Sequence, residues 1–216
     1  MHVQIALYDG FDPLDVLGPF EVFHSAGEFS GGGVSTEFVS AEGAREVPSG
    51  FPSIKLTATS AVDVNKKSVI VVPGAAGSLS MDPGVAGGIG WILSQARSTD
   101  LPGRLREALA RPDMTVATVC GGSILLAHAG LADGRPLVTH ERGQDLAGTK
   151  AVPVEARMVD DGNLLSSGNV TSGIDLALYL VEREVGPRVA HAVSELIRHE
   201  RRGTVWSATG TPVSLA

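Results

Sequence analysis

Runs of consecutive apolar residues, each stopped by turn residues, dominate the hydrophobic pattern of the chain. The segments SVIVVPG (68–74) and MTVATV (114–119) are apolar along nearly their whole length, which predicts strands buried on both faces of a parallel sheet. The alternating segment VQIALY (3–8) predicts a first strand. Further strands are predicted within 31–43 and over 135–141, with a hairpin or short edge strands over 47–64 and a hairpin over 152–168.

Apolar residues at helical spacing lie between these predicted strands. The clearest helix covers 171–186, where Thr171 or Ser172 can cap the start and Gly186 ends it. The tail after residue 203 shows no periodicity. Further helices are predicted over 17–27, 84–98, 101–111, 123–130 and 187–203, with a weak one over 142–148.

This alternation of strands and helices predicts an α/β fold: a doubly wound, mostly parallel sheet with helices on both faces. We expect a single domain over 1–216, with a core over 3–200 and an irregular tail. In such a sheet the working crevice lies at the carboxyl ends of the strands. Three loops leave strand ends here, over 9–15, 73–77 and 120–123, and we expect them to converge.

The composition limits which binding partners and which cellular location are expected. The 216 residues include 17 Lys and Arg against 24 Asp and Glu, a net charge of −7, which argues against nucleic acid or an anionic membrane as the main partner. One cysteine forms no internal disulfide, so the expected location is the cytoplasm. The first residues do not resemble a signal peptide, and no run of about 18 apolar residues predicts a membrane span.

The single cysteine, Cys120, lies where the strand over 114–119 turns into a helix. A residue at such a turn often has a strained backbone, and Gly121 and Gly122 relieve crowding beside it. Backbone N–H groups and the helix dipole favour a thiolate there, which predicts a lowered pKa for Cys120. Free cysteine is also among the most buried residue types. Position alone therefore leaves two interpretations, a nucleophile and a packed apolar residue.

Two carboxylates, Asp12 and Asp15, follow the first predicted strand. A carboxyl group near a thiol can orient it and shuttle a proton. An Asp in a loop before a helix can instead cap that helix. We expect Asp12 to be an N-cap, and the residue pattern alone leaves Asp15 open between the two roles.

Four motifs are spread over nearly the whole chain: LDVLGPFEVF, VIVVPGAAG, VATVCGGSILLAHAGLADGRPLVTH and DGNLLSSGNVTSGIDLALYLVE. Together they resemble the ThiJ/PfpI superfamily, which implies a flavodoxin-like and glutamine-amidotransferase-like fold. Within that superfamily the chain looks most like the isonitrile hydratase branch, because Asp15 stands in an LD-x-x-GP context. It is similar also to the sensor domains of a class of AraC-type regulators, which share the GIDLAL helix.

The resemblance implies roles for several residues. Cys120 matches the nucleophile of the family, and Asp15 matches the acidic partner of its thiol. Gly74 and Ala75 match a loop whose backbone N–H groups help form an oxyanion site, to which the N–H of Gly121 can add. The chain departs from the family where PGAAG replaces the common PGG, and where Gly121 replaces the Thr that often follows the cysteine.

The resemblance also points to a second group of residues. His140 matches the histidine of a TTH motif, here VTHE, and stays open between catalysis and a strand-end residue bonded to backbone. Asn169, Val170 and Thr171 match a loop that approaches the helix of the cysteine, and we expect them to line the pocket. Neither a dinucleotide fingerprint nor a phosphate loop is present, and the scattered histidines do not suggest a metal site.

These residues are compatible with three functions. The first is a cofactor-free isonitrile hydratase in which Cys120 forms a thioimidate and Asp15 moves the proton. The second is a glyoxalase III or deglycase type of enzyme, in which the cysteine attacks a reactive carbonyl. The third is a non-catalytic ligand-binding or redox-sensing module in which the cysteine is oxidised. The resemblance also implies a homodimer acting on a small-molecule substrate.

Overall fold

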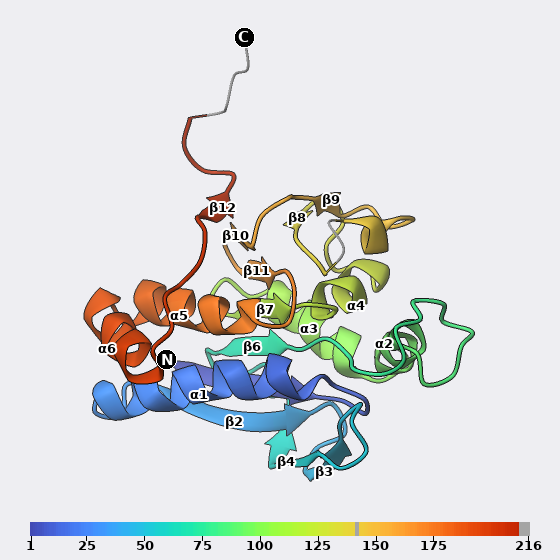
Figure 1. The fold of residues 1–216 in the computed structure, drawn as a ribbon, viewed down its shortest axis with the longest axis horizontal. Helices are drawn as coiled ribbons and strands as arrows, with labels where there is room; N and C mark the ends of the chain where they lie inside the picture. The colour runs from blue at the N-terminus through green and yellow to red at the C-terminus, as the bar shows by residue number, and fades with distance from the viewer. Residues whose placement is uncertain (141–142, 212–216) are drawn as a thin grey trace.

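The computed structural model describes residues 1–140 and 143–211, and its centre is one large sheet (Figure 1). Among the described strands of this sheet, every neighbouring pair is parallel except β10 and β11. This confirms the predicted fold class. The strand order is β12 (Val205–Ser207), β10 (Met158–Asp161), β11 (Leu164–Ser167), β7 (Thr115–Val119), β6 (Val69–Val72), β1 (His2–Leu7), β2 (Ser35–Ser40) and β5 (Ser60–Ala61).

Helices cover both faces of the sheet, as predicted. Helices α1, α5 and α6 pack on one another on one face, and α2 packs on α3 and α4 on the other. No helix of the described residues is long and apolar enough to cross a bilayer. The helices are α1 (Pro13–Phe29), α2 (Ile89–Arg97), α3 (Leu101–Leu109), α4 (Gly122–His128), α5 (Ser172–Glu184) and α6 (Pro187–Ile197).

Two small pairs of strands lie outside the main sheet. β3 (Arg45–Pro48) and β4 (Lys55–Ala58) form an antiparallel hairpin that begins two residues before the segment 47–64, which was predicted to hold a hairpin or short edge strands. β8 (Pro136–Leu137) pairs in parallel with β9 (Val152–Pro153), and the short 3₁₀ helix η1 (Gln144–Leu146) lies between them in the chain.

Several element boundaries differ from those predicted; α6, for example, ends at Ile197 and not at residue 203. α1 begins at Pro13 instead of residue 17, because the side chain of Asp12 accepts the Leu14 N–H at 2.9 Å and caps the first turn. The helix predicted from residue 84 begins only at Ile89, after a glycine-containing turn. The tail predicted to be irregular contains β12, which pairs with β10. A three-residue strand is too short to give a periodic pattern.

Strand register brings the predicted loops together. β6 lies between β1 and β7, with Val71 opposite Ile5 and Val72 opposite Thr118. All three strands run in the same direction, so their carboxyl ends lie side by side at one edge of the sheet. β6 is buried at all four residues, which fixes this register through core packing. The loops after β1, β6 and β7 therefore converge as expected.

Candidate active site

Cys120 occupies a sharp turn between β7 and α4. Its φ is 53°, in the left-handed region, as expected for a strained residue at a strand-to-helix elbow. Its N–H donates to the Ser167 carbonyl at 2.9 Å, and the buried hydroxyls of Thr118 and Ser123 bond across the turn at 2.6 Å. A Cβ at Gly122 would lie 2.3 Å from the Val72 carbonyl oxygen. Glycine at 122 therefore allows the close approach of α4 to β6.

Asp15 projects from the first turn of α1 into the same strand-end region and is fully buried. Its Oδ2 accepts the N–H of Gly74 at 2.8 Å, and its buried Oδ1 has no hydrogen-bond partner among the described residues. A Cβ built on Gly74 would lie 2.8 Å from that Oδ2 and 2.6 Å from the Gly121 nitrogen. The absence of a side chain at Gly74 therefore allows the carboxyl of Asp15 and the turn that carries Cys120 to approach the same point.

Burial controls the protonation of this pair. Burial raises the pKa of the Cys120 thiol above its ordinary value, the negative charge of Asp15 raises it further, and the Gly121 N–H acts in the opposite direction. Burial also raises the pKa of Asp15, with Asp12 contributing in the same sense. The sequence led us to expect a lowered pKa for Cys120, and the structure corrects that expectation: burial and a carboxylate outweigh one N–H and a helix of two turns. The pair therefore retains at least one proton at neutral pH, and can exchange it with a bound molecule.

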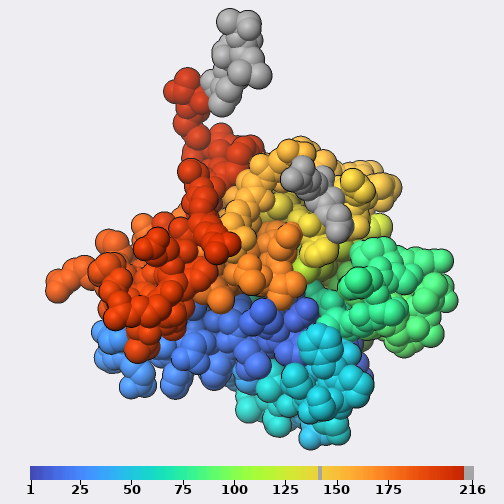
Figure 2. All heavy atoms as spheres, in the orientation of Figure 1, coloured from blue at the N-terminus to red at the C-terminus, as the bar shows by residue number. Residues whose placement is uncertain are grey.

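Cys120 opens into a cavity of about 230 Å³ with mainly apolar walls. One wall comes from the segment 78–88 before α2, which stands out from the body of the molecule beside α2 (Figure 2, green). Backbone bonds close the base of this segment, from Ser78 to Gly87 at 3.0 Å and from Ile89 to Ser78 at 3.1 Å. Leu79 at the cavity mouth is 89% exposed. The apolar side chains lining the cavity are Phe51, Ala75, Ala76, Leu79, Met81, Ile89, Ile124 and Val170.

Of the three residues predicted to form an oxyanion site, two line the Cys120 cavity and one bonds to Asp15. Ala75 and Gly121 line the Cys120 cavity. The N–H of Gly74 donates to Asp15, so in this structure it holds the carboxylate in place and is not directed at an oxyanion. Asp12 caps α1, which confirms its predicted structural role.

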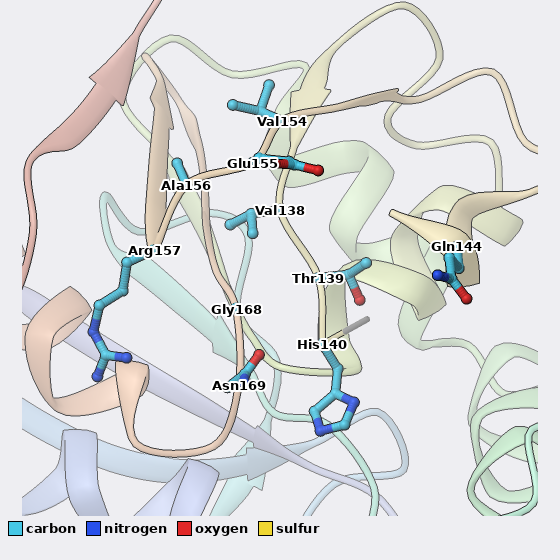
Figure 3. A pocket seen from close by; sticks show the side chains of 10 residues that line it. All are labelled: Val138, Thr139, His140, Gln144, Val154, Glu155, Ala156, Arg157, Gly168 and Asn169. Atoms are coloured by element: carbon cyan, nitrogen blue, oxygen red, sulfur yellow. The ribbon is translucent and has the colours of Figure 1, made fainter. Parts of the chain in front are cut away.

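His140 lies between the Cys120 cavity and a larger neighbouring cavity of about 750 Å³. Figure 3 shows its ring at the same end of the larger cavity as Asn169. Val170 lines the Cys120 cavity, whereas Thr171 accepts a hydrogen bond from Arg157 at 3.3 Å. The 168–171 loop therefore borders both cavities, and the chemical role of His140 stays a prediction.

Two features of the site region were not predicted from sequence. Tyr8, directly after β1, is 3% exposed, and burial raises its pKa, with the charges of Asp15 and Cys120 acting in the same direction. Fully buried Asp175 accepts Arg157 Nε at 2.7 Å and contacts His199 Nε2 at 2.9 Å, which ties the 168–171 loop region to the segment after α6. The sequence places Asp175 in the first turn of a helix, but its partners lie 18 and 24 residues away, where no local pattern indicates them.

Comparisons with known proteins agree with this geometry. A family model described as the DJ-1/PfpI family matches residues 1–183. The chain is 32% identical over 194 residues to an isonitrile hydratase of Pseudomonas putida, covering 89% of this chain and 76% of that protein. It is also 32% identical over 121 residues to the transcriptional regulator GbdR of Pseudomonas aeruginosa, but this match covers only 54% of the chain and 32% of the regulator.

Solved structures show the same fold. Drosophila melanogaster DJ-1beta superposes with a TM-score of 0.71 at 18% identity, covering 91% of this chain and 97% of that one. A ThiJ/PfpI family protein from Pseudomonas syringae gives a TM-score of 0.71 at 24% identity, covering 94% of this chain and 76% of that one.

Proposed function

Because the chain belongs to the DJ-1/PfpI family, we propose that it is a cysteine-dependent, cofactor-free enzyme that hydrates an isonitrile, R–N≡C, to an N-substituted formamide. One observation carries this proposal: the carboxyl of Asp15 and the Gly121 nitrogen, directly after Cys120, both lie within 3 Å of the point that a Cβ on Gly74 would occupy, and Cys120 lines an apolar cavity. The similarity to the isonitrile hydratase of Pseudomonas putida supports it.

The first half of the proposed reaction uses the proton that the pair retains. The Cys120 sulfur bonds to the terminal carbon of the isonitrile, and the proton of the thiol passes through Asp15 to that same carbon. The product is a thioimidate, R–N=CH–S–Cys. The unpartnered Oδ1 of Asp15 is the oxygen available for this transfer.

Hydrolysis completes the cycle without an oxidant or reductant. Water adds to the thioimidate carbon and gives one proton to nitrogen, forming R–NH–CH(OH)–S–Cys. The C–S bond then breaks with its electron pair returning to sulfur, and the hydroxyl proton returns through Asp15 to the thiol. R–NH–CHO leaves, and the pair again carries its proton. One proton on the pair is the active form, so activity falls on the acid side as Asp15 becomes protonated as well.

Formamide production from an aryl isonitrile, followed by chromatography, tests this function directly. Failure to turn over any isonitrile would contradict it. A second candidate function is supported by the position of His140 on the wall of the Cys120 cavity. An enzyme acting on reactive carbonyls would instead turn over methylglyoxal, and the turnover would fall with His140→Ala.

Replacing Asp15 with Asn should separate thiol reactivity from turnover. The charge of Asp15 raises the pKa of Cys120, so its removal should shift the pH dependence of iodoacetamide alkylation to lower pH. Turnover should nevertheless fall by about 10²-fold to 10⁴-fold, because the proton carrier is lost.

The matched control for Asp15→Asn is Asp12→Asn, which removes a neighbouring charge with a smaller effect on Cys120 and leaves an amide that still caps α1. Its alkylation curve should move less than that of Asp15→Asn. An Asp15→Asn protein with wild-type turnover would rule out Asp15 as the proton carrier.

The apolar cavity favours an isonitrile with an uncharged, apolar side group. Leu79→Ser should raise KM for phenyl isonitrile by about fivefold while leaving kcat nearly unchanged, since part of a leucine's burial is worth about 1 kcal/mol. Methyl isonitrile, too small to reach the mouth, should show little change. Leu196→Ser on α6, another exposed leucine, serves as the control. Equal effects on both substrates would place Leu79 outside the substrate contacts.

A further inference from the structure

Tyr8 is a buried titratable group beside the site that the proposed reaction leaves without a role. Its ring is 3% exposed, and its hydroxyl donates to the carbonyl oxygen of Pro73 at 2.8 Å. Burial raises the pKa of this phenol well above its ordinary value, and the charge of Asp15 adds to the effect. The hydroxyl therefore stays protonated and remains a donor throughout the range in which Asp15 titrates.

The acceptor of this bond belongs to the same peptide unit that holds Asp15. The Pro73 carbonyl and the Gly74 N–H are the two ends of one peptide group, and that N–H donates to Asp15 Oδ2 at 2.8 Å. The next carbonyl, that of Gly74, accepts the N–H of Asp12 at 2.9 Å. The orientation of this peptide is therefore set by Tyr8 on one side and by the start of α1 on the other.

We propose that Tyr8 is a positioning residue for Asp15 and acts through the Pro73–Gly74 peptide. A donor on the carbonyl end of a peptide polarises it and strengthens donation from its N–H end, by about 10–30% per bond in connected networks. It also fixes the plane in which the N–H points. The relay runs from the Tyr8 hydroxyl through this peptide to Oδ2, while Oδ1 is buried and has no hydrogen-bond partner among the described residues.

The groups around Asp15 oppose its ionisation, so its pKa depends on the Gly74 N–H donor. Asp12 faces it from the start of α1, Cys120 from the elbow and Tyr8 from the end of β1. Asp145 and His140 line the Cys120 cavity, and the charge of Asp145 raises the pKa of the Cys120 thiol. Burial and Asp12 raise the pKa of Asp15, whereas the Gly74 N–H lowers it. Weakening that N–H should therefore raise the pKa of Asp15 further.

Tyr8→Phe removes only the hydroxyl and tests the relay. We expect the acid limb of the kcat/KM profile to move up by about half a pH unit, because one neutral hydrogen bond contributes about 1 kcal/mol and only part of it reaches Asp15. We expect kcat to fall severalfold with KM changed less than twofold. Tyr179→Phe is the matched control, because Tyr179 is the only other tyrosine and donates to Asp160. Its acid limb should coincide with that of the wild type.

Fluorotyrosine tests the same relay in the opposite direction and preserves packing. In a Tyr179→Phe background Tyr8 is the only tyrosine, so biosynthetic replacement with 3-fluorotyrosine labels that residue alone. A fluorinated phenol is a stronger donor, so the acid limb should move to lower pH. A purely structural effect of Tyr8→Phe predicts no such opposite shift, and an unchanged profile in both proteins would overturn the proposal.

The kcat/KM test of the relay rests on the proposed function, because it needs a substrate that is turned over. Alkylation of Cys120 by iodoacetamide tests the relay without a substrate. The rate of Cys120 alkylation by iodoacetamide should show a lower inflection from Asp15, which Asp15→Asn removes. Tyr8→Phe should raise this inflection and fluorotyrosine should lower it. If no isonitrile is turned over but these shifts appear, the function fails and the relay stands. If isonitriles are turned over and neither curve moves, the relay fails and the function stands.

Discussion

Cys120→Ser should reduce isonitrile hydration by at least about 10³-fold, because loss of a nucleophile removes the covalent path and leaves only binding and polar contacts. Serine keeps the size and shape of the side chain at the strained elbow, so the variant should fold normally. The expected loss therefore lies in kcat/KM and not in the amount of folded protein. Formamide production measures the first, and circular dichroism with thermal unfolding measures the second.

Serine also distinguishes a nucleophile from an apolar core residue. A packed cysteine would tolerate the exchange with full activity and at most a modest loss of stability, because the thiol behaves there as a small apolar group. Cys120 is 8% exposed and lines a cavity, so both interpretations predict a folded protein and they differ only in activity. Retention of most of the wild-type activity would exclude the covalent mechanism.

Gly74→Ala should lower both activity and stability, and it does so without changing the nucleophile itself. The added Cβ would lie 2.6 Å from the Gly121 nitrogen and 2.8 Å from Asp15 Oδ2, distances that real Cβ contacts do not show. The β6 loop or the Cys120 turn must therefore shift. Misplacing reacting groups by about 1 Å can reduce activity by about 10²-fold, and overpacking destabilises by about 1–3 kcal/mol. Activity assays and denaturant unfolding measure the two effects.

Gly103→Ala is the matched control for this exchange. Gly103 lies in α3, where an added Cβ meets nothing within 4 Å. Alanine there should leave activity unchanged and stabilise the helix by about 0.5–1 kcal/mol. An active, stable Gly74→Ala protein would show that the spacing between Asp15 and the elbow is not critical.

The positions of Cys120 and Asp15 were predictable because they depend on strand ends. Uninterrupted apolar runs identify buried parallel strands, and adjacent parallel strands place the loops that follow them at one edge. The pattern therefore indicated that the loops after residues 7, 72 and 119 converge, and the structure confirms it. The catalytic roles of these residues, the homodimer and the cytoplasmic location stay predictions.

The protonation of the pair and the role of Tyr8 were not predictable in the same way. Both depend on depth of burial and on partners distant in sequence: Tyr8 bonds to a backbone carbonyl 65 residues away, and Asp15 to a backbone N–H 59 residues away. A backbone partner leaves no trace in residue type, so no motif marks it. β12 was missed for a related reason, because its formation depends on the free edge of β10 more than on its own three side chains.

The left-handed backbone at Cys120 has a consequence for how sequence changes at this position. A side chain in that conformation costs roughly 1 kcal/mol relative to glycine. Selection for folding stability alone would therefore favour glycine at the elbow. Under the proposed mechanism the thiol at this position is kept at a cost in folding stability, so a variant with glycine there should keep the fold and lose the proposed reaction.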